Sequence, residues 1–349
     1  MNIVIIGAGV AGLATGWRLL QQGCAVTILD RAQPGHGASW AAAGMLGVTA
    51  EMADAPQAER DLALRANDLW SDFATELEQA AGGGIGYVRP GALMLAADAP
   101  ALDAMRARGP VLTAEQVAAL VPMLGPQSGG LWSPDEAHVD PRVLCQALAI
   151  AFHKAGGQLI ANAPVIGIDE QHGRARAVLT PFGRQGGDAF LIAAGAWTGL
   201  LDDLPIRPIK GEMIALKPGH ESELPGPVIW GEGVYLVPRA GRLLIGATMQ
   251  EVGFDTSLSR ASRNFLWSQA ARLIPAVRNW TLDDHWAGLR PATPDGLPVL
   301  GPLALPNLFV AGGQARNGIL FTPAIAQHMC DLIQGKAGVI PDFDPKRFV

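Results

Sequence analysis

The sequence has few of the residues that mark a disulfide-rich, metal-binding or basic protein. Its 349 residues include three cysteines, Cys24, Cys145 and Cys330, which lie far apart without CxxC spacing. That spacing suits neither a disulfide framework nor a thiolate metal site, so we expect reduced, mostly buried thiols and no metal centre. No long Lys/Arg run occurs and the formal net charge is −6, which argues against nucleic acid as a partner.

Long apolar runs are also missing. The most apolar stretch, residues 190–197, is far shorter than the roughly 20 residues of a membrane-spanning helix. The N-terminus starts directly with an apolar strand and lacks the basic region and cleavage site of a secretory signal. We therefore expect a cytoplasmic protein with no membrane partner. Hydrophobic residues, at 49%, and 43 glycines are abundant, which is typical of a well-buried globular enzyme.

The order of the predicted helices and strands indicates an α/β protein in which two domains are threaded through each other. A parallel α/β pattern opens the chain and returns in its middle and at its end. Its expected strands cover residues 2–6, 25–29, 158–161, 189–194 and 307–311, and its expected helices cover 10–22, 57–81, 140–157 and 323–334. Short strand-like runs at 87–97 and 211–245, separated by turn residues, predict a mainly antiparallel sheet.

A nucleotide-binding signal lies at the first strand-to-helix turn. Residues 7–12 read GAGVAG, the GxGxxG pattern of a Rossmann-type fold, in which Gly7 permits the tight turn, Gly9 lets a pyrophosphate approach and Gly12 lets the helix pack closely. Asp30 ends the second strand and is placed to accept hydrogen bonds from ribose hydroxyls. The motif fits NAD and FAD equally, and a plain glycine-rich turn is the simpler alternative.

The segment that follows the second strand favours FAD. Residues 35–47 read GHGASWAAAGMLG, where a nicotinamide dehydrogenase usually continues into its second helix. Small side chains leave backbone amides free to contact a flavin. The alternative is a flexible loop.

Five blocks of the sequence carry a family resemblance. They cover residues 3–30, 37–47 (GASWAAAGMLG), 191–199 (LIAAGAWTG), 235–249 (YLVPRAGRLLIGATM) and 286–323, which includes WAGLRPATPDGLPVLG and LFVAGGQARNGILFTP. In this order they resemble the D-amino-acid oxidase family of FAD proteins, most closely its glycine oxidase branch, the enzyme of thiamine biosynthesis.

The resemblance implies a set of FAD contacts, position by position. Val10 and Ala11 would touch the pyrophosphate, Asp30 and Arg31 the adenosine half, Ala38 and Ser39 the diphosphate, Ala43, Gly44 and Met45 the isoalloxazine, and Val165 the adenine. Gln314, Ala315, Arg316, Asn317, Gly318, Ile319 and Leu320 would surround the pyrimidine end. Related sarcosine oxidases carry a cysteine as covalent flavin anchor near the stretch that is GLRP here, at 288–291. The resemblance thus implies non-covalent FAD.

The resemblance also implies how a substrate is held. Arg290 would pair with a substrate carboxylate through both arms of its guanidinium, a strong and orienting contact. Arg316 would stand at the mouth of the site, and Tyr235, Met249 and Gly47 would line it. No catalytic base is implied, and His285 and His328, beside the motifs, are interpreted as structural. The chain departs from the branch at Gln314-Ala315, where a His and an aromatic residue are common, and at Gly233, where a His is frequent.

These implications combine into one hypothesis. An FAD-binding domain, residues 1–81, 140–210 and 285–349, would be interleaved with a substrate-binding domain, residues 82–139 and 211–284. The protein would oxidise glycine or another small amino acid to a 2-oxo acid and ammonia, with oxygen as acceptor, giving hydrogen peroxide, and it would form a homo-oligomer. An amine or N-methyl/D-amino-acid dehydrogenase with another acceptor, a nicotinamide dehydrogenase and a tRNA-modifying flavoprotein remain as alternatives.

Overall fold

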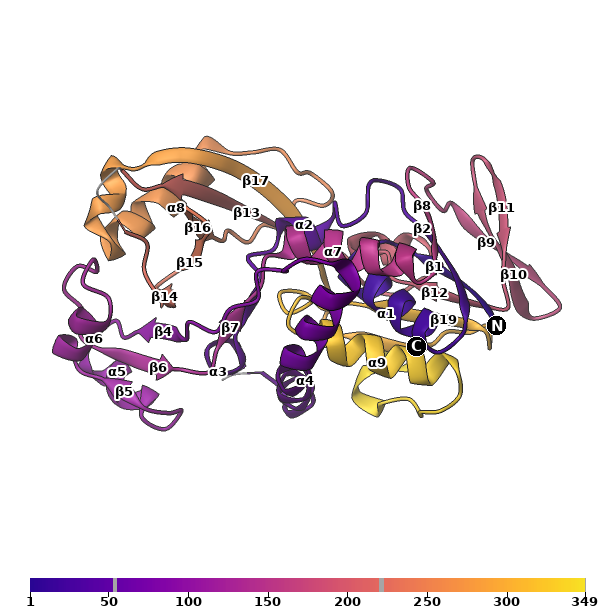
Figure 1. Cartoon of the computed structure of the whole chain (residues 1–349), viewed down its shortest axis with the longest axis horizontal. Helices are drawn as coiled ribbons and strands as arrows, with labels where there is room; N and C mark the ends of the chain where they lie inside the picture. Colours follow the sequence, from indigo (N-terminus) through magenta and orange to yellow (C-terminus); the bar gives the residue numbers. More distant parts are fainter. Residues whose placement is uncertain (53–54, 220–222, 349) are drawn as a thin grey trace.

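The computed structural model describes residues 1–52, 55–219 and 223–348 of the chain. The other positions fall inside the expected domain ranges and lie outside the described residues. The ribbon has two lobes (Figure 1): the right-hand lobe holds both chain termini, and the left-hand lobe is built mainly from the purple and orange middle parts of the chain. Among the described helices, none combines the length and apolar character needed to cross a bilayer.

The right-hand lobe is built on a six-stranded sheet whose order is β18-β19-β12-β1-β2-β8. Its strands are β1 (Asn2–Ile6), β2 (Ala25–Leu29), β8 (Gln158–Ile160), β12 (Ala189–Ile192), β18 (Val299–Pro302) and β19 (Leu308–Gly312). All neighbours are parallel except β18 and β19. Because this one sheet joins strands from the beginning, the middle and the end of the sequence, the expected return of the α/β pattern is confirmed.

Alternation along the strands puts the two faces of this sheet into different cores. Ile3 and Ile5 belong to the core under the helices α1 (Val10–Gln21), α4 (Gln57–Ala81), α7 (Pro141–Lys154) and α9 (Thr322–Ile333). Val4 and Ile6 point to the opposite core, which is covered by the antiparallel strands β9 (Gly167–Gln171), β10 (Arg174–Thr180) and β11 (Gly183–Gly186). Both faces are therefore buried, as the continuous apolar character of β1 requires.

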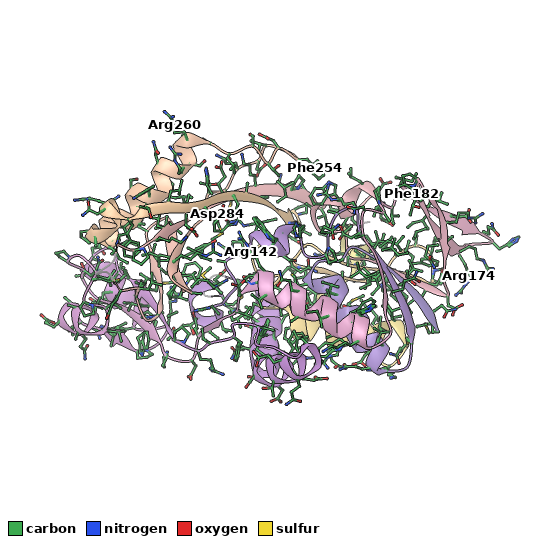
Figure 2. The ribbon with its side chains drawn as sticks, turned by 45° about the horizontal axis from the view of Figure 1, so that its top comes forward. Arg142, Arg174, Phe182, Phe254, Arg260 and Asp284 are labelled. Carbon is green, nitrogen blue, oxygen red and sulfur yellow. The ribbon has the colours of Figure 1, made fainter. Side chains whose placement is uncertain are left out.

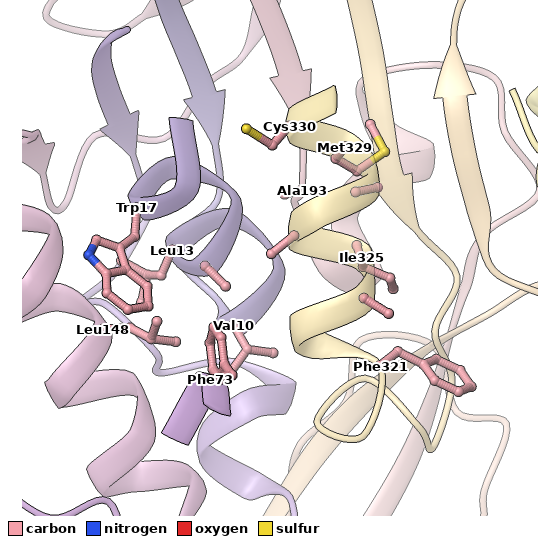
Figure 3. Packing of buried hydrophobic residues seen from close by; sticks show 14 of the residues in the cluster. Val10, Leu13, Trp17, Phe73, Leu148, Ala193, Phe321, Ile325, Met329 and Cys330 are labelled. Carbon is pink, nitrogen blue, oxygen red and sulfur yellow. The ribbon is translucent and has the colours of Figure 1, made fainter. Parts of the chain in front are cut away.

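Helices α1 and α9 pack side by side in the helical core (Figure 3). Leu13 of α1 and Met329 of α9 are both 0% exposed, and Trp17 meets Phe73 of α4 edge-to-face with ring centroids 5.8 Å apart. Each such side chain contributes about 1.5–3 kcal/mol by burial. This core fixes the N-terminal end of α1 against the carboxyl edge of the sheet.

The left-hand lobe contains an eight-stranded sheet in the order β17-β13-β16-β15-β14-β4-β6-β5. Its strands are β4 (Ala92–Leu95), β5 (Val111–Leu112), β6 (Gly130–Ser133), β13 (Arg207–Lys217), β14 (Val228–Gly231), β15 (Val234–Arg239), β16 (Arg242–Gly246) and β17 (Thr281–Ala292). Only β14 and β4 pair in parallel. The expected mainly antiparallel sheet is therefore confirmed.

The two faces of this second sheet also differ. Helix α8 (Arg260–Leu273) covers one face, where its Leu266 packs against Ile214 and Leu236. The short helices α5 (Ala99–Met105) and α6 (Ala114–Leu120) lie near its β5 end. The opposite face, with Met213 and Trp286, contacts Ala41 from the first lobe. That face supplies one wall of the site described below.

Side chains bridge the two lobes near the middle of the molecule. The guanidinium of Arg142, on α7, lies over the rings of Trp40 and Trp286 at 3.6 and 4.9 Å from their centroids. It also pairs with Asp284 of β17, at 3.4 Å between Nη2 and Oδ2, and Figure 2 labels both residues. These contacts hold the antiparallel sheet against the segment at residues 40–44.

Candidate active site

Two neighbouring cavities share lining residues where the two lobes meet. The nucleotide-side cavity, about 300 Å³, lies at the carboxyl edge of the six-stranded sheet. The sheet-side cavity, about 280 Å³, lies against the eight-stranded sheet. Both are lined by Ala38, Ala42, Ala315, Arg316 and Ile319. A ligand can therefore extend from one cavity into the other.

Most of the residues expected to contact FAD line these cavities. Those on the nucleotide-side cavity are Gly7, Gly9, Val10, Ala11, Asp30, Arg31, Ala38, Ser39, Val165, Gln314, Ala315, Arg316, Gly318 and Ile319. Ala43, Gly44 and Met45 line the sheet-side cavity. The structure thus brings together residues that are far apart in the sequence, at 7–11, 30–31, 38–45, 165 and 314–319.

Four expected site residues stand behind the cavity walls. Gly12 packs on the strand side of α1, and Leu320 is buried, with its carbonyl accepting from Trp70 Nε1 at 2.7 Å. Asn317 donates from Nδ2 to Glu59 Oε1 at 2.9 Å. Gly47 is buried and precedes the short helix α3 (Val48–Glu51). These residues shape the site from outside rather than lining it.

The N-terminus of α1 is open to an anionic ligand. The helix starts at Val10, has no side-chain cap on Gly9 and no acidic residue in its first turn. The Val10 amide donates to Ser39 Oγ at 3.1 Å, which joins the helix start to the segment around α2 (Ala38–Ala41). A Cβ on Gly12 would lie 1.9 Å from the Gly7 carbonyl oxygen, so only glycine permits this approach of helix and strand. The amides that follow Val10 in the first turn and the helix dipole favour a phosphate here.

Asp30 is held by the backbone at the edge of the nucleotide-side cavity. Its two carboxylate oxygens accept from the Ala8 amide at 2.6 Å and from the Ala32 amide at 2.8 Å. Each oxygen keeps a further lone pair for a ligand hydroxyl. Beyond it, the Arg31 guanidinium stacks on Trp197, at 3.3 Å from the ring centroid.

The carbonyl groups of residues 40–44 are anchored from outside the cavities. Trp286 Nε1 donates to the Ala41 carbonyl at 3.0 Å, and Arg239 Nη2 donates to the Ala43 carbonyl at 2.6 Å. The Val139 amide donates to the Gly44 carbonyl at 2.9 Å. Because buried donors hold these carbonyls in place, residues 41–44, whose side chains are no larger than a methyl group, present a fixed backbone surface between the two cavities.

Arg290 reaches the sheet-side cavity from β17 across the neighbouring strand. Its Nη1 donates to the Thr248 carbonyl at 3.2 Å. A Cβ on Gly211 of β13 would lie 2.1 Å from Arg290 Nη1, so this glycine makes the room that the guanidinium occupies. The guanidinium also lies within hydrogen-bonding reach of Tyr235, and with five N–H groups in all it keeps a pair for a bound carboxylate.

Aromatic and sulfur-containing side chains complete the wall around Arg290. Tyr235 and Trp230 contact each other with ring centroids 5.3 Å apart, and Tyr235 Oη lies 3.6 Å from Met213 Sδ. Burial raises the pKa of Tyr235, so the phenol stays protonated. Met249 is 65% exposed and the Arg316 side chain is 53% exposed, which puts both at the rim. The expected positions of Arg290, Tyr235, Met249 and Arg316 on one cavity agree with this geometry.

Sequence reasoning missed several residues that line the sheet-side cavity, among them Glu51, Met213 and Trp230. Glu51 had a detectable signal, because no Asp, Glu, Lys or Arg occurs between Arg31 and Glu51. An isolated charge at the end of an apolar segment that contacts the flavin in the resembling family is a candidate site residue. Met213 and Trp230 give no such signal.

The residues interpreted as structural remain outside the site. The cysteines are free, with Cys145 and Cys330 buried and Cys24 partly exposed. Burial raises the pKa of the Cys145 thiol to about 12. His285 contacts Glu212 at 2.9 Å between Nε2 and Oε2, and His328 is buried on α9. None of these side chains lines either cavity.

Comparison with known proteins identifies the family. The model of the family described as FAD dependent oxidoreductase, abbreviated DAO, matches residues 2–332. The chain belongs to this family. The expected resemblance and fold class are confirmed.

Individual relatives extend this result. A bifunctional protein ThiO/ThiG from a Synechocystis species is 37% identical over 357 residues, covering 100% of this chain and 54% of the relative. The chain spans about half the length of such bifunctional relatives. The glycine oxidase of Geobacillus kaustophilus is 34% identical over 354 residues, covering 96% of this chain and 93% of the relative. A crystal structure of glycine oxidase from that organism superposes with a TM-score of 0.94 at 32% identity and covers 99% of this chain and 98% of that chain.

The residues present fit FAD. The uncapped start of α1 and the second lone pairs of Asp30 suit the pyrophosphate and the ribose. Gln314 Nε2 is a buried donor on the nucleotide-side cavity without a hydrogen-bond partner among the described residues. A flavin carbonyl would satisfy this amide, which otherwise costs about 1–3 kcal/mol.

Proposed function

We propose that this chain oxidises glycine or another small amino acid at its α-carbon, giving a 2-oxo acid, ammonia and hydrogen peroxide, in the supply of thiamine thiazole. The observation that carries the proposal is Arg290, a cation in a cavity of about 280 Å³ that adjoins the FAD cavity. This volume is at the small end for ligand sites. The relatives named glycine oxidase and ThiO/ThiG support the same reaction.

In the proposed reaction, the guanidinium of Arg290 pairs with the substrate carboxylate and so orients the α-carbon. Bound FAD supplies the two-electron acceptor for the hydride that leaves this carbon. The anchored backbone of residues 40–44 and the rings of Trp230 and Tyr235 exclude water from the α-carbon. The imine product is then hydrolysed in water to the oxo acid and ammonia.

The proposed FAD-binding residues are those on the nucleotide-side cavity together with Ala43, Gly44 and Met45. Residues 1–81, 140–210 and 285–349 form the proposed FAD-binding domain, and residues 82–139 and 211–284 form the proposed substrate-binding domain. Strands β13 and β17 of the eight-stranded sheet cross the boundaries at 210/211 and 284/285. FAD is non-covalent in this proposal because no cysteine lies in the stretch 288–291. We also propose that the protein is cytoplasmic and forms a homo-oligomer.

The departures from the glycine oxidase branch bear on substrate range. Gly233 lines the sheet-side cavity, and Gln314 lines the nucleotide-side cavity. A residue without a side chain at 233 leaves the cavity wider there than a histidine would. We therefore include sarcosine and D-alanine beside glycine as proposed substrates.

The test is flavin bleaching. Purified holoenzyme is mixed anaerobically with glycine, sarcosine or D-alanine, and loss of the visible flavin bands is recorded. Oxygen is then admitted and peroxide is measured, with an artificial dye as the competing acceptor. Bleaching by at least one amino acid, followed by peroxide release, supports the proposal. No bleaching with any of them refutes the substrate class, and reoxidation by the dye alone refutes oxygen as acceptor.

A further inference from the structure

Glu51 is a carboxylate on the sheet-side cavity that the reaction above does not use. It ends α3, lines the cavity, and its side chain is 8% exposed. Its Oε2 has no hydrogen-bond partner among the described residues, and the ion pair with Arg316 Nε spans 3.7 Å. A buried oxygen with unused lone pairs therefore faces the space where the substrate would lie.

The backbone around Glu51 is held from two sides. The Thr49 amide donates to Glu136 Oε1 at 2.6 Å, and the Thr49 carbonyl accepts from Arg108 Nη2 at 2.9 Å. Glu136 is thus engaged with α3, and it does not line the cavity. Within the described chain, Glu51 is the acidic side chain that lines the sheet-side cavity.

Charged groups from several elements face this carboxylate. Arg316, after β19, and Arg290, on β17, lower its pKa, whereas Glu136, before β7 (Ala137–His138), and Glu59, on α4, raise it. Tyr235 of β15 is also within electrostatic reach. Burial outweighs these charges and raises the pKa of Glu51 to about 7. The group therefore changes its charge within the neutral range, where a general base is effective.

The chemistry of amino-acid oxidation requires that the substrate nitrogen lose a proton. A free amino acid is a zwitterion in neutral water, and its ammonium nitrogen has no lone pair. Loss of a hydride from the α-carbon forms a carbon–nitrogen double bond, which needs that lone pair. With the carboxylate on Arg290, the ammonium group lies in a cavity with two arginines, which disfavour a third positive charge.

We propose, on the basis of the amino-acid oxidation proposed above, that Glu51 accepts the proton of the substrate ammonium group. An N–H bond breaks, its electron pair stays on nitrogen, and the proton binds Glu51 Oε2, so that an ammonium and a carboxylate become an amine and a carboxyl group. Bound FAD would supply the acceptor for the hydride. The carboxyl proton returns to solvent when the product leaves.

The first test is the pH profile of kcat/KM for the amino acid that bleaches the wild-type flavin. The wild type should rise through an inflection near pH 7 and then level off. Glu51→Gln keeps the size but cannot accept the proton, so the inflection should disappear and kcat/KM at pH 7.5 should fall roughly 100-fold. The kcat/KM of Glu51→Gln should then increase about tenfold for each unit of rising pH, because free amine accumulates in solution.

Glu232→Gln is the matched control. Glu232 is exposed and lies between two glycines that line the cavity, without lining it itself. The Glu232→Gln substitution removes the same charge close to the cavity and should leave the pH profile of kcat/KM unchanged. An inflection near pH 7 that persists in Glu51→Gln overturns the proposal, as does the same loss in both variants.

A second measurement does not depend on turnover. Acetate carries a carboxylate but no amine, and its binding to the holoenzyme is followed by the change in flavin absorbance. Ionised Glu51 should repel it, so wild-type affinity should fall roughly tenfold between pH 6 and 8.5, whereas Glu51→Gln should bind acetate equally across that range. Parallel acetate profiles in the two proteins overturn the proposal.

The proposed function and this inference fail in different ways. If no amino acid bleaches the wild-type flavin, the proposed function is wrong, and so is the assignment of Glu51 as proton acceptor. If amino acids bleach it but Glu51→Gln retains the wild-type profile, only the assignment of Glu51 is wrong.

Discussion

Replacing Arg290 by alanine tests the centre of the proposed substrate site. One of the five guanidinium N–H groups already donates to the Thr248 carbonyl, so two can still form a fork on the substrate carboxylate. Hydrogen bonds to charged groups contribute about 1.5–3 kcal/mol each. Their joint loss, at least about 3 kcal/mol, corresponds to a decrease in kcat/KM of more than roughly 100-fold, at about 1.36 kcal/mol per factor of ten.

Most of this loss should be a rise in KM, because the carboxylate pair forms in the ground state and persists in the transition state. Arg290→Lys keeps a charge without the planar fork and should fall between the wild type and alanine. Steady-state peroxide assays give kcat/KM, and the absorbance spectrum of the purified protein gives FAD content. Arg260→Ala, on the exposed first turn of α8, is the control. A loss below tenfold, or loss of FAD together with activity, would refute this role of Arg290.

Three further predictions concern the cofactor and stability. Acid precipitation should release yellow FAD into the supernatant, and colour retained in the pellet would refute non-covalent binding. Gly12→Ala puts a Cβ 1.9 Å from the Gly7 carbonyl oxygen, so it should cost roughly 3–5 kcal/mol of unfolding free energy and most of the bound FAD, whereas Gly226→Ala, with open space around it, should cost little. Burial lowers the pKa of His138 to about 4, below its value of 6.5 in the unfolded chain. The unfolded chain therefore binds the proton first, and stability should fall by up to about 3 kcal/mol as the pH drops from 6.5 to 4. In urea unfolding, His138→Gln should flatten this dependence and His153→Gln should not.

The nucleotide-binding part of the site could be predicted because its requirements are local. Gly7 and Gly12 are required by a close contact between strand and helix within six residues of chain. Asp30 comes directly after β2, the strand that follows this helix. Helix 57–81 was predicted with its bounds, since Gly82 adopts the left-handed conformation, at φ 85°, that ends many helices. These local sequence patterns predict the same local structure whatever the rest of the fold is.

Tertiary pairing decides what the sequence could not show. The antiparallel block was expected to begin at residue 211, yet β13 begins at Arg207 and carries Pro208 opposite Pro291 of β17. Prolines are tolerated there because β17 is the edge strand of its sheet and β13 pairs with β16 only from Met213 onward, so no central ladder is interrupted. Glu51 and Arg316 lie 265 positions apart in numbering but form one ion pair, and no local pattern predicts that contact.

The charges of the sheet-side cavity together explain why a small zwitterion suits it. Arg290 and Arg316 attract a carboxylate, and at neutral pH Glu51 neutralises them only in part, because burial keeps its pKa near 7. An amine without a carboxylate would therefore meet excess positive charge in a poorly solvated space. A carboxylate without an amine would bind but lacks the nitrogen lone pair that oxidation needs. An α-amino acid carries both groups on one carbon and can satisfy Arg290 and Glu51 at once, so selectivity in this proposal rests on charge placement, and the width at Gly233 then decides which α-substituents are accepted.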